Sequence, residues 1–211
     1  MNEFFIVSKS GEGEIVEKKS RFIAHVIPVE TEEEALFNIE LIKKQYWDAR
    51  HNCFAFVIGR NNEIQRFSDD GEPQGTAGKP ILEVLINGNI HNTLIVVTRY
   101  FGGTLLGTGG LVRAYGLSSK EGLKNAQVMR VCSGVAFTVE TDYNSIGKIK
   151  YIMGQFNIKA QEEYGAGVKL SIEMKKEDFA NFKNNIVDVT SNQAVWSDVT
   201  EIDYGEPIIN K

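Results

Sequence analysis

The order of strand and helix patterns after about residue 130 most restricts the fold of this chain. Alternating apolar residues predict four strands there, at 131–140, 158–164, 168–174 and 194–204. Apolar residues at three- and four-residue spacing predict two helices, at about 146–156 and 179–189. The order strand, helix, strand, strand, helix, strand is that of a ferredoxin-like domain, an antiparallel sheet with two helices on one face.

The preceding residues also mix strand and helix patterns. Strands are predicted at 4–7, 22–27, 53–58, 64–67 and 93–100. A capping box begins a helix at Thr31 that should run to about Arg50, and shorter patterns predict helices at about 81–86 and 111–125. Segment 68–80 has the Gly, Pro and Asp content of a loop. We therefore predict an α+β protein of two domains, residues 1–134 and 135–211.

Composition agrees with a globular protein and limits its partners. Of 211 residues, 42% are apolar and 24% charged, which is enough apolar material for a core. The net charge of -5 is uneven, because residues 1–135 hold 15 Lys and Arg against 16 Asp and Glu, and the rest hold 8 against 12. A contact with a polyanion must therefore be local, and no DNA sequence specificity is expected.

No apolar run approaches the roughly 20 residues of a membrane span, and the first residues do not follow the pattern of a signal peptide. Cys53 and Cys132 are interpreted as buried thiols rather than a disulfide. These features predict a cytoplasmic protein without a membrane partner.

Glycine is concentrated in one part of the chain. Nine of the 20 glycines lie between Ser68 and Gly110. The second cluster precedes a predicted helix, whose free N–H groups and dipole favour an anion. Hydroxyl and guanidinium groups flank it, so one interpretation is a cradle for an oxyanion or phosphate. Its candidate residues are Arg99, Gly102, Gly103, Thr104, Gly107, Thr108, Gly109, Gly110 and Arg113.

An alternative interpretation is purely structural. Glycines would let the two loops pack tightly while Asp69 or Asp70 neutralises the arginines. The residue types do not decide between these two interpretations. Known nucleotide motifs do not fit, because Gly78-Lys79 is followed by Pro80 instead of Ser or Thr, and the GxG at Gly107 has no third glycine at position 112.

Other polar residues give weaker signals. His51 and Cys53 share one face of a predicted strand, but no third orienting group is evident, so a structural pair is favoured over catalysis. No set of residues has the spacing of metal ligands, and no metal or cofactor is expected. A basic cluster, Lys18, Lys19 and Arg21, fits either a phosphate contact or a solvated strand edge.

Five motifs resemble one known family. They are Lys18-Lys19-Ser20-Arg21-Phe22, Ala49-Arg50-His51-Asn52-Cys53, Ser68-Asp69-Asp70-Gly71-Glu72-Pro73, Gly75-Thr76-Ala77-Gly78-Lys79-Pro80 and Arg99-Tyr100-Phe101-Gly102-Gly103-Thr104 with Leu106-Gly107. In this order they are similar to the signature of the IMPACT (YigZ-like) family. The similarity covers the whole chain and includes the C-terminal module of bacterial members.

The resemblance implies a fold and a field of activity. The N-terminal domain should share the β-α-β fold of a small-subunit ribosomal protein, a domain of elongation factor G and the GHMP kinases, and the C-terminal domain should resemble the last domain of elongation factor G. Eukaryotic relatives regulate translation initiation through the amino-acid starvation kinase pathway, using an RWD domain that these residues do not contain. That partner mechanism is therefore not expected here, and the kinase likeness is analogy alone.

Two functions remain open from the sequence, beside a third interpretation as a structural or interaction module without a ligand at the loops. The first, which we favour, is a non-enzymatic regulator of translation that contacts RNA or the ribosome through Lys18, Lys19, Arg21, Lys79 and the second glycine cluster. The alternative is an enzyme or sensor for a small phosphorylated ligand, with Asp69, Asp70 or Glu72 as acid, base or charge partner. No residue is assigned a catalytic role, because no nucleophile and no intact phosphate motif is present.

Overall fold

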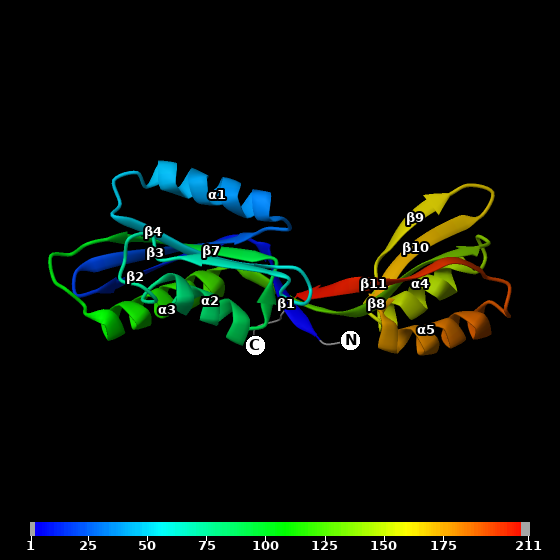
Figure 1. Cartoon of the computed structure of the whole chain (residues 1–211). Coiled ribbons are helices and arrows are strands. Elements are labelled where there is room, and N and C mark those ends of the chain that lie inside the picture. Colours follow the sequence, from blue (N-terminus) through cyan, green and yellow to red (C-terminus); the bar gives the residue numbers. More distant parts are fainter. Residues whose placement is uncertain (1–2, 208–211) are drawn as a thin grey trace. The chain divides into compact units, whose positions relative to one another are not determined.

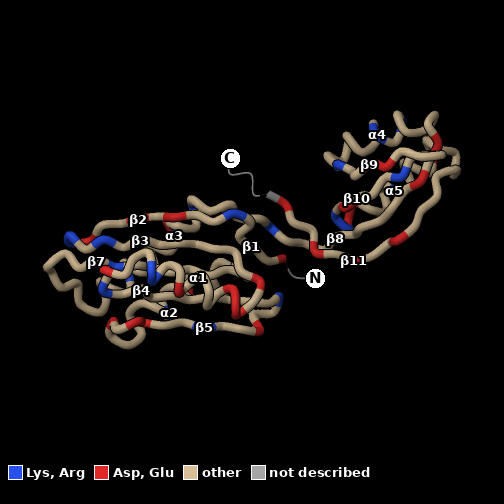
Figure 2. Tube along the Cα trace, turned by 90° about the horizontal axis from the view of Figure 1, so that it is seen from above, with Lys and Arg blue, Asp and Glu red and all other residues tan. Residues whose placement is uncertain are grey.

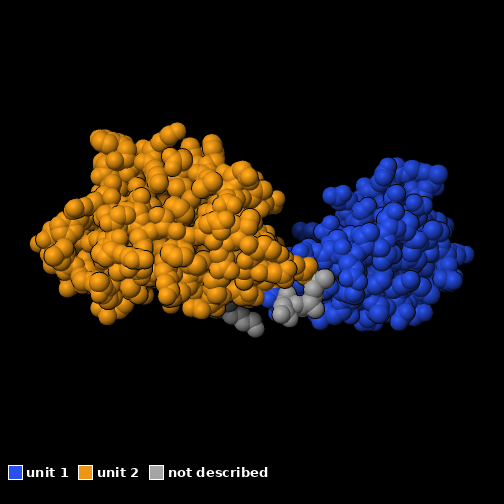
Figure 3. Space-filling view, viewed as in Figure 1, with its two compact units in different colours: residues 1–3, 131–206 blue, residues 4–130, 207–211 orange. Residues whose placement is uncertain are grey.

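The structure is a computed structural model that describes residues 3–207, and these residues form two compact units (Figures 1 and 3). The N-terminal unit holds residues 4–130 and 207, and the C-terminal unit holds residues 3 and 131–206. Strand β8 (Gln127–Thr141) begins in the first unit and continues in the second. The boundary predicted between residues 134 and 135 therefore lies inside a strand. Within residues 3–207, every helix is too short or too polar to span a lipid bilayer.

The N-terminal unit is built on a five-stranded antiparallel sheet in the order β2-β3-β7-β4-β5. Helix α1 covers one face of this sheet, and helices α2 and α3 cover the other (Figure 1). A short parallel pair, β1 with β6, belongs to the other sheet. The strands are β1 (Phe4–Lys9), β2 (Gly11–Glu17), β3 (Ser20–Pro28), β4 (His51–Ile58), β5 (Ile64–Ser68), β6 (Ile90–His91) and β7 (Thr93–Tyr100). The helices are α1 (Glu32–Gln45), α2 (Gly78–Asn87) and α3 (Thr108–Asn125).

Strand β7 is the centre of this sheet, which explains its continuous apolar sequence. Leu94 and Val96 pack with α1, whereas Ile95 and Val97 pack with α2 and α3. A strand that is covered on both faces needs apolar residues at every position, not at alternate ones. Arg99 follows Ile95 and Val97 in the same alternation, so its side chain lies on the α2 and α3 face.

The C-terminal unit has the predicted ferredoxin-like order, which confirms the α+β fold of two domains. Strand β11 pairs with β8, β8 with β10, and β10 with β9. Apolar residues of both helices form one core with the sheet, around Phe137, Leu170 and Phe182. The elements after β8 are α4 (Ile146–Gln155), β9 (Ala160–Tyr164), β10 (Val168–Lys175), α5 (Lys176–Val189) and β11 (Val195–Pro207).

The helices of the N-terminal unit differ from the sequence prediction at their ends. Helix α1 is capped by Thr31, whose Oγ1 accepts from the Glu34 N–H at 3.2 Å, but it ends at Gln45 and not near Arg50. Helices α2 and α3 each begin three residues earlier than predicted. Gly109 and Gly110 therefore lie in the first turn of α3, with Gly107 as its N-cap residue.

Candidate functional site

Three strands align polar side chains on the α2 and α3 face of the sheet. In the strand register, Arg99 of β7 lies opposite Phe22 of β3 on one side and opposite His51 of β4 on the other. Ser20 is two residues before Phe22 and shares its face, and its Oγ lies 3.5 Å from Arg99 Nη2. The antiparallel register thus brings together residues that are far apart in the sequence.

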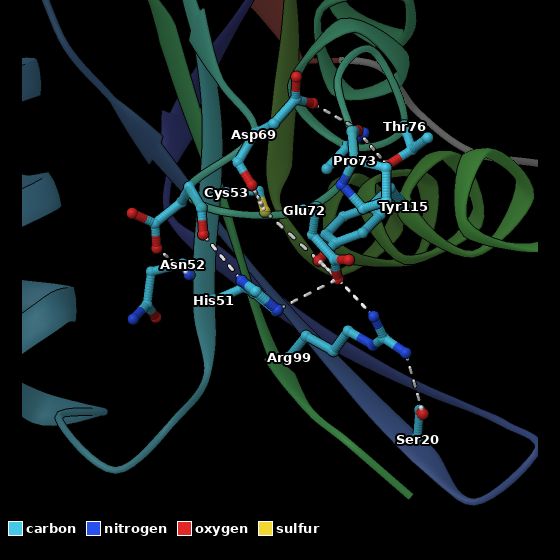
Figure 4. A network of polar contacts seen from close by, with 12 residues as sticks. Ser20, His51, Asn52, Cys53, Asp69, Glu72, Pro73, Thr76, Arg99 and Tyr115 are labelled. Atoms are coloured by element: carbon cyan, nitrogen blue, oxygen red, sulfur yellow. Dashed lines mark hydrogen bonds and ion pairs between the residues drawn. The ribbon is translucent and has the colours of Figure 1, made fainter. Parts of the chain in front are cut away.

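A buried carboxylate, Glu72, joins these strands to α3. Its Oε1 accepts from Arg99 Nη1 at 2.5 Å and from the Tyr115 hydroxyl at 2.8 Å, and His51 Nε2 lies 3.9 Å away (Figure 4). The side chains of Glu72 and Arg99 are 4% and 7% exposed. Breaking such a buried pair would leave one charge without a partner in a poorly solvated place. Glu72, and neither Asp69 nor Asp70, therefore neutralises Arg99.

His51 is oriented by the loop that carries Glu72. Its Nδ1 lies 2.8 Å from the Asp70 carbonyl oxygen, which can only accept, so Nδ1 carries the hydrogen. In the neutral ring Nε2 then has a free lone pair on the side of Glu72. His51 lines the same cavity as Glu72, described below, so its imidazole belongs to the wall.

Cys53 does not form the predicted pair with His51. Its Sγ donates to the Asp69 carbonyl oxygen at 3.0 Å and lies 3.3 Å from the Tyr115 hydroxyl. Burial raises the pKa of the Cys53 thiol and of the Tyr115 hydroxyl, so both keep their protons at neutral pH. A protonated, buried thiol is a poor nucleophile, and Cys53 contributes packing and hydrogen bonds.

The two aspartates of the first glycine loop are used by the backbone. Asp69 Oδ1 accepts from the N–H groups of Ala77 and Gly78 at 3.0 and 2.8 Å, and its Oδ2 accepts from Gly75 at 2.8 Å. This carboxylate lies at the N-terminus of α2, where it compensates the free N–H groups. Asp70 Oδ2 accepts from the Asn52 N–H at 2.7 Å. In these positions both side chains act as structural hydrogen-bond acceptors.

The glycines of the two loops fall into two classes. A Cβ on Gly102 would lie 2.0 Å from the carbonyl carbon of Lys19, and one on Gly78 would lie 2.7 Å from the Ser68 carbonyl oxygen. These two glycines allow backbones to approach closely, as the structural interpretation of the loops requires. By contrast, a Cβ on Gly103, Gly107 or Gly109 would meet no described atom within 4 Å. This second class surrounds open space.

Gly107 of this second class lines a cavity of about 360 Å³ on the α2 and α3 face. Both glycine loops contribute to its wall. The polar side chains that line it are Arg50, His51, Glu72, Arg99 and Thr108. The apolar ones are Pro73, Phe101, Leu105, Leu106 and Leu111, and Gly71 and Gly107 complete the lining.

The basic residues predicted as candidates lie in different places. Arg99 is buried in the cavity wall, whereas Lys18, Lys19, Lys79 and Arg113 are exposed and lie outside the lining residues. Lysines 18 and 19 form the turn between β2 and β3, seen as blue segments in Figure 2. Arg21 is held by Glu14, with its Nε 2.8 Å from Oε1. Thr104 is exposed in the loop before α3.

Sequence reasoning missed several members of this site. From the sequence, His51 is predicted only as a partner of Cys53, and Arg50, Phe101 and Leu105 are not predicted as binding residues. The spacing between His51 and Arg99 carries no local pattern, since their proximity depends on strand register. The five motifs do contain these residues, apart from Leu105. Among residues 3–207, no cluster of His, Cys, Asp and Glu has the arrangement of a metal site.

A family model for the Impact N-terminal domain matches residues 18–123, and a model for a domain of unknown function, DUF1949, matches residues 139–193. A solved crystal structure of a hypothetical protein is 33% identical, with a TM-score of 0.59 over 93% of this chain and 97% of that chain. Fold and site thus define a two-domain α+β protein with an Impact-type N-terminal domain.

Relatives specify the family. IMPACT family member YvyE of Bacillus subtilis is 41% identical over all of this chain and 97% of its own length. IMPACT family member YigZ of Escherichia coli is 37% identical over 81% of this chain and 85% of its own length. The chain belongs to the IMPACT family, which confirms the resemblance of its motifs. Protein IMPACT of Mus musculus is similar over 44% of this chain and 30% of its own length, at 34% identity.

Proposed function

We propose that this chain is a non-enzymatic regulator of translation that contacts RNA or the ribosome through the turn between β2 and β3. Family membership supports a regulatory role, and the N-terminal unit contains the part shared with eukaryotic relatives named Protein IMPACT. The observation that carries the proposal is the conformation of Lys18 and Lys19. These two residues form a two-residue turn, with Glu17 paired to Ser20.

Both lysines have a positive φ, 45° for Lys18 and 66° for Lys19. Two-residue hairpin turns of this kind favour Asn and Gly, which tolerate the left-handed region at lower cost. A pair of lysines therefore costs folding free energy, and strain of this type concentrates where function requires particular side chains. Two adjacent exposed ammonium groups at a hairpin tip suit the phosphates of a nucleic acid.

The surroundings of the turn agree with this role. Gly102 packs directly against Lys19, and its N–H donates to Ser20 Oγ at 3.1 Å, so the loop that begins at Phe101 lies beside the lysines. Phe101 is 42% exposed and offers a ring on which an unpaired base can stack. Arg99 is too buried to meet a phosphate of a macromolecule. The contact would therefore be small, in agreement with a net charge of -5.

The test replaces the lysines by the residues that the turn prefers, in a Lys18→Asn/Lys19→Gly variant. The control, Lys43→Ala/Lys44→Ala, removes the same charge from the last turn of α1, the helix on the face of the sheet opposite α2 and α3. Binding of the full chain to poly(U) RNA and to purified ribosomal subunits is measured at two salt concentrations. We expect the turn variant to lose about tenfold in affinity and to show a smaller salt dependence, because two phosphate contacts are lost.

Stability separates this result from misfolding. The turn variant should unfold at a higher urea concentration than the parent chain, because the strained residues are replaced by favoured ones. Binding and stability would thus change in opposite directions. Equal binding by the turn variant and the parent chain, or no binding of RNA and subunits by the parent chain at low salt, would show that the proposal is wrong.

A further inference from the structure

The cavity beside Arg99 has features that the RNA contact does not use. Lys18 and Lys19 do not belong to its lining, and its volume of about 360 Å³ is too small for a folded RNA. Cavities of about 300–1,000 Å³ are the usual size for small-molecule sites. The cavity shares Phe101 with the proposed RNA contact, but its other lining residues take no part in that contact and need their own explanation.

The first feature is the N-terminus of α3. This helix of 18 residues begins at Thr108, and its N-cap residue, Gly107, has no side chain that could accept from the first turn. The first backbone hydrogen bond of the helix runs from the Leu111 N–H to the Gly107 carbonyl oxygen at 3.0 Å. The N–H groups of Thr108, Gly109 and Gly110 precede this bond, so they have no backbone partner within the helix. Gly107 and Thr108 line the cavity. Free N–H groups and the helix dipole together attract an anion to this end.

The second feature is the buried guanidinium of Arg99. The residue is only 5% exposed, and its Nε has no hydrogen-bond partner among the residues that the structure describes. Glu72 and Ser20 occupy the other two nitrogens. A buried charged N–H without an acceptor costs free energy, and an oxygen atom of a ligand in the cavity would remove this cost.

Charge in this part of the sequence points to the same class of ligand. No Asp or Glu occurs between Glu83 and Glu121, whereas Arg99 and Arg113 both lie in that interval. Glu72 balances Arg99, and the exposed Arg50 adds a positive charge at the rim. The wall is therefore positive overall, counting the helix terminus.

The rest of the wall is apolar. Phe101 and Leu105 are 42% and 82% exposed, and Leu106, Leu111 and Pro73 complete this side. Exposed apolar side chains that gather at the mouth of a cavity are typical of ligand sites, where they bury the body of a small molecule. A bare inorganic ion would leave this surface unused.

We propose that this cavity binds a small organic anion, a carboxylate or a phosphate monoester that carries an apolar or aromatic body. The oxyanion lies at the first turn of α3 and receives hydrogen bonds from its N–H groups and from Arg99 Nε. The body packs against Phe101, Leu105 and Leu106.

The test titrates the full chain with four probes and follows the amide signals of Gly103, Gly107 and Gly109 by NMR. The probes are phenyl phosphate, 3-phenylpropionate, inorganic phosphate and benzyl alcohol. We expect at least one ring-bearing anion to bind with a Kd of about 1 mM or lower, and inorganic phosphate and benzyl alcohol to bind at least about tenfold more weakly. Which of the two ring-bearing anions binds assigns the carboxylate or the phosphate class.

Two matched variants introduce the same negative charge, one at the site and one away from it. Thr108→Glu puts a carboxylate at the first position of α3, where it competes with the ligand for the N–H groups, and should weaken binding at least about tenfold. Leu117→Glu puts the same charge on an exposed position of the same helix outside the cavity, and should bind as the parent chain does. Thermal unfolding verifies that both variants are folded.

Three results would overturn the proposal. They are no shift of the three glycine signals by either ring-bearing anion at about 10 mM, inorganic phosphate binding as tightly as phenyl phosphate, and unchanged binding by Thr108→Glu. None of these depends on RNA. The Lys18→Asn/Lys19→Gly variant should keep its affinity for the probe, so failure of the RNA contact and failure of the cavity site are distinguishable.

Discussion

The 71–78 and 102–110 loops each lead into a helix on the same face of the five-stranded sheet, and each carries glycines with positive φ. The first loop folds over Asp69, whose carboxylate accepts three backbone N–H groups before and at the start of α2. The second loop leads into α3, whose N-cap residue, Gly107, has no side chain to accept from the first turn. One helix N-terminus is filled by the chain itself, and the other borders a cavity.

This difference shows how little a glycine count reveals about binding. Both loops have the residues of an anion cradle, and what separates them is an acidic residue at a suitable distance in the sequence. Asp69 precedes the amides it binds by six to nine residues, whereas no Asp or Glu lies within the interval from 84 to 120. A loop that brings its own carboxylate is structural, and a loop without one keeps its N–H groups for another acceptor.

The largest effect should come from the residue that joins the two loops. Glu72 belongs to the first loop, and it holds Arg99 under the second. Glu72→Ala leaves Arg99, a residue that is 5% exposed, without its carboxylate, and should lower the free energy of unfolding by about 3–5 kcal/mol in urea denaturation. Glu14→Ala removes the partner of the exposed Arg21 and should cost far less, since solvent screens that pair. Similar losses in the two variants would show that the buried pair is not what fixes the loops.

Removal of the Asp69 carboxylate should have the next largest effect. Asp69→Ala leaves the N–H groups of Gly75, Ala77 and Gly78 without their acceptor, and should destabilise the chain by about 2–3 kcal/mol. Asp69→Asn keeps one acceptor oxygen and should recover part of this loss. Both values come from chemical denaturation. If the alanine variant were as stable as the parent chain, the two helix termini would not differ in the way described.

The parts of the structure that the sequence predicted are those with local patterns. The ferredoxin-like order follows from the period of apolar residues along each element, and β7 from its continuous apolar run. The start of α2 is predicted too late because the carboxylate that accepts from its first N–H group, that of Asp69, is nine residues before Gly78. The sequence predicts the site only in part. Glu72 pairs with Arg99, 27 residues away in the sequence, and strand register places His51 opposite Arg99. Such contacts depend on the folded sheet and have no sequence period.

Single methyl groups can separate the two classes of glycine. Gly102→Ala forces a Cβ into the backbone of Lys19 and should destabilise the chain by about 2 kcal/mol. Gly109→Ala adds a methyl group in the first turn of α3, where no described atom lies within 4 Å of it, and should stabilise the helix by about 0.5 kcal/mol. Urea unfolding curves of both variants decide this. A loss of stability in Gly109→Ala would mean that its surroundings are not open.

The smallest effect should come from a variant in which the second loop resembles the first. Thr108→Glu supplies α3 with a carboxylate at its N-terminus, as Asp69 does for α2, and should raise the free energy of unfolding by about 0.3–1 kcal/mol. The gain should shrink at high salt, because the interaction of a charge with a helix dipole is screened. Leu117→Glu, farther along the same helix, should show no such gain. If Thr108→Glu were destabilising, the N–H groups of the first turn would already have acceptors, and the open terminus of α3 could not serve as the anion site.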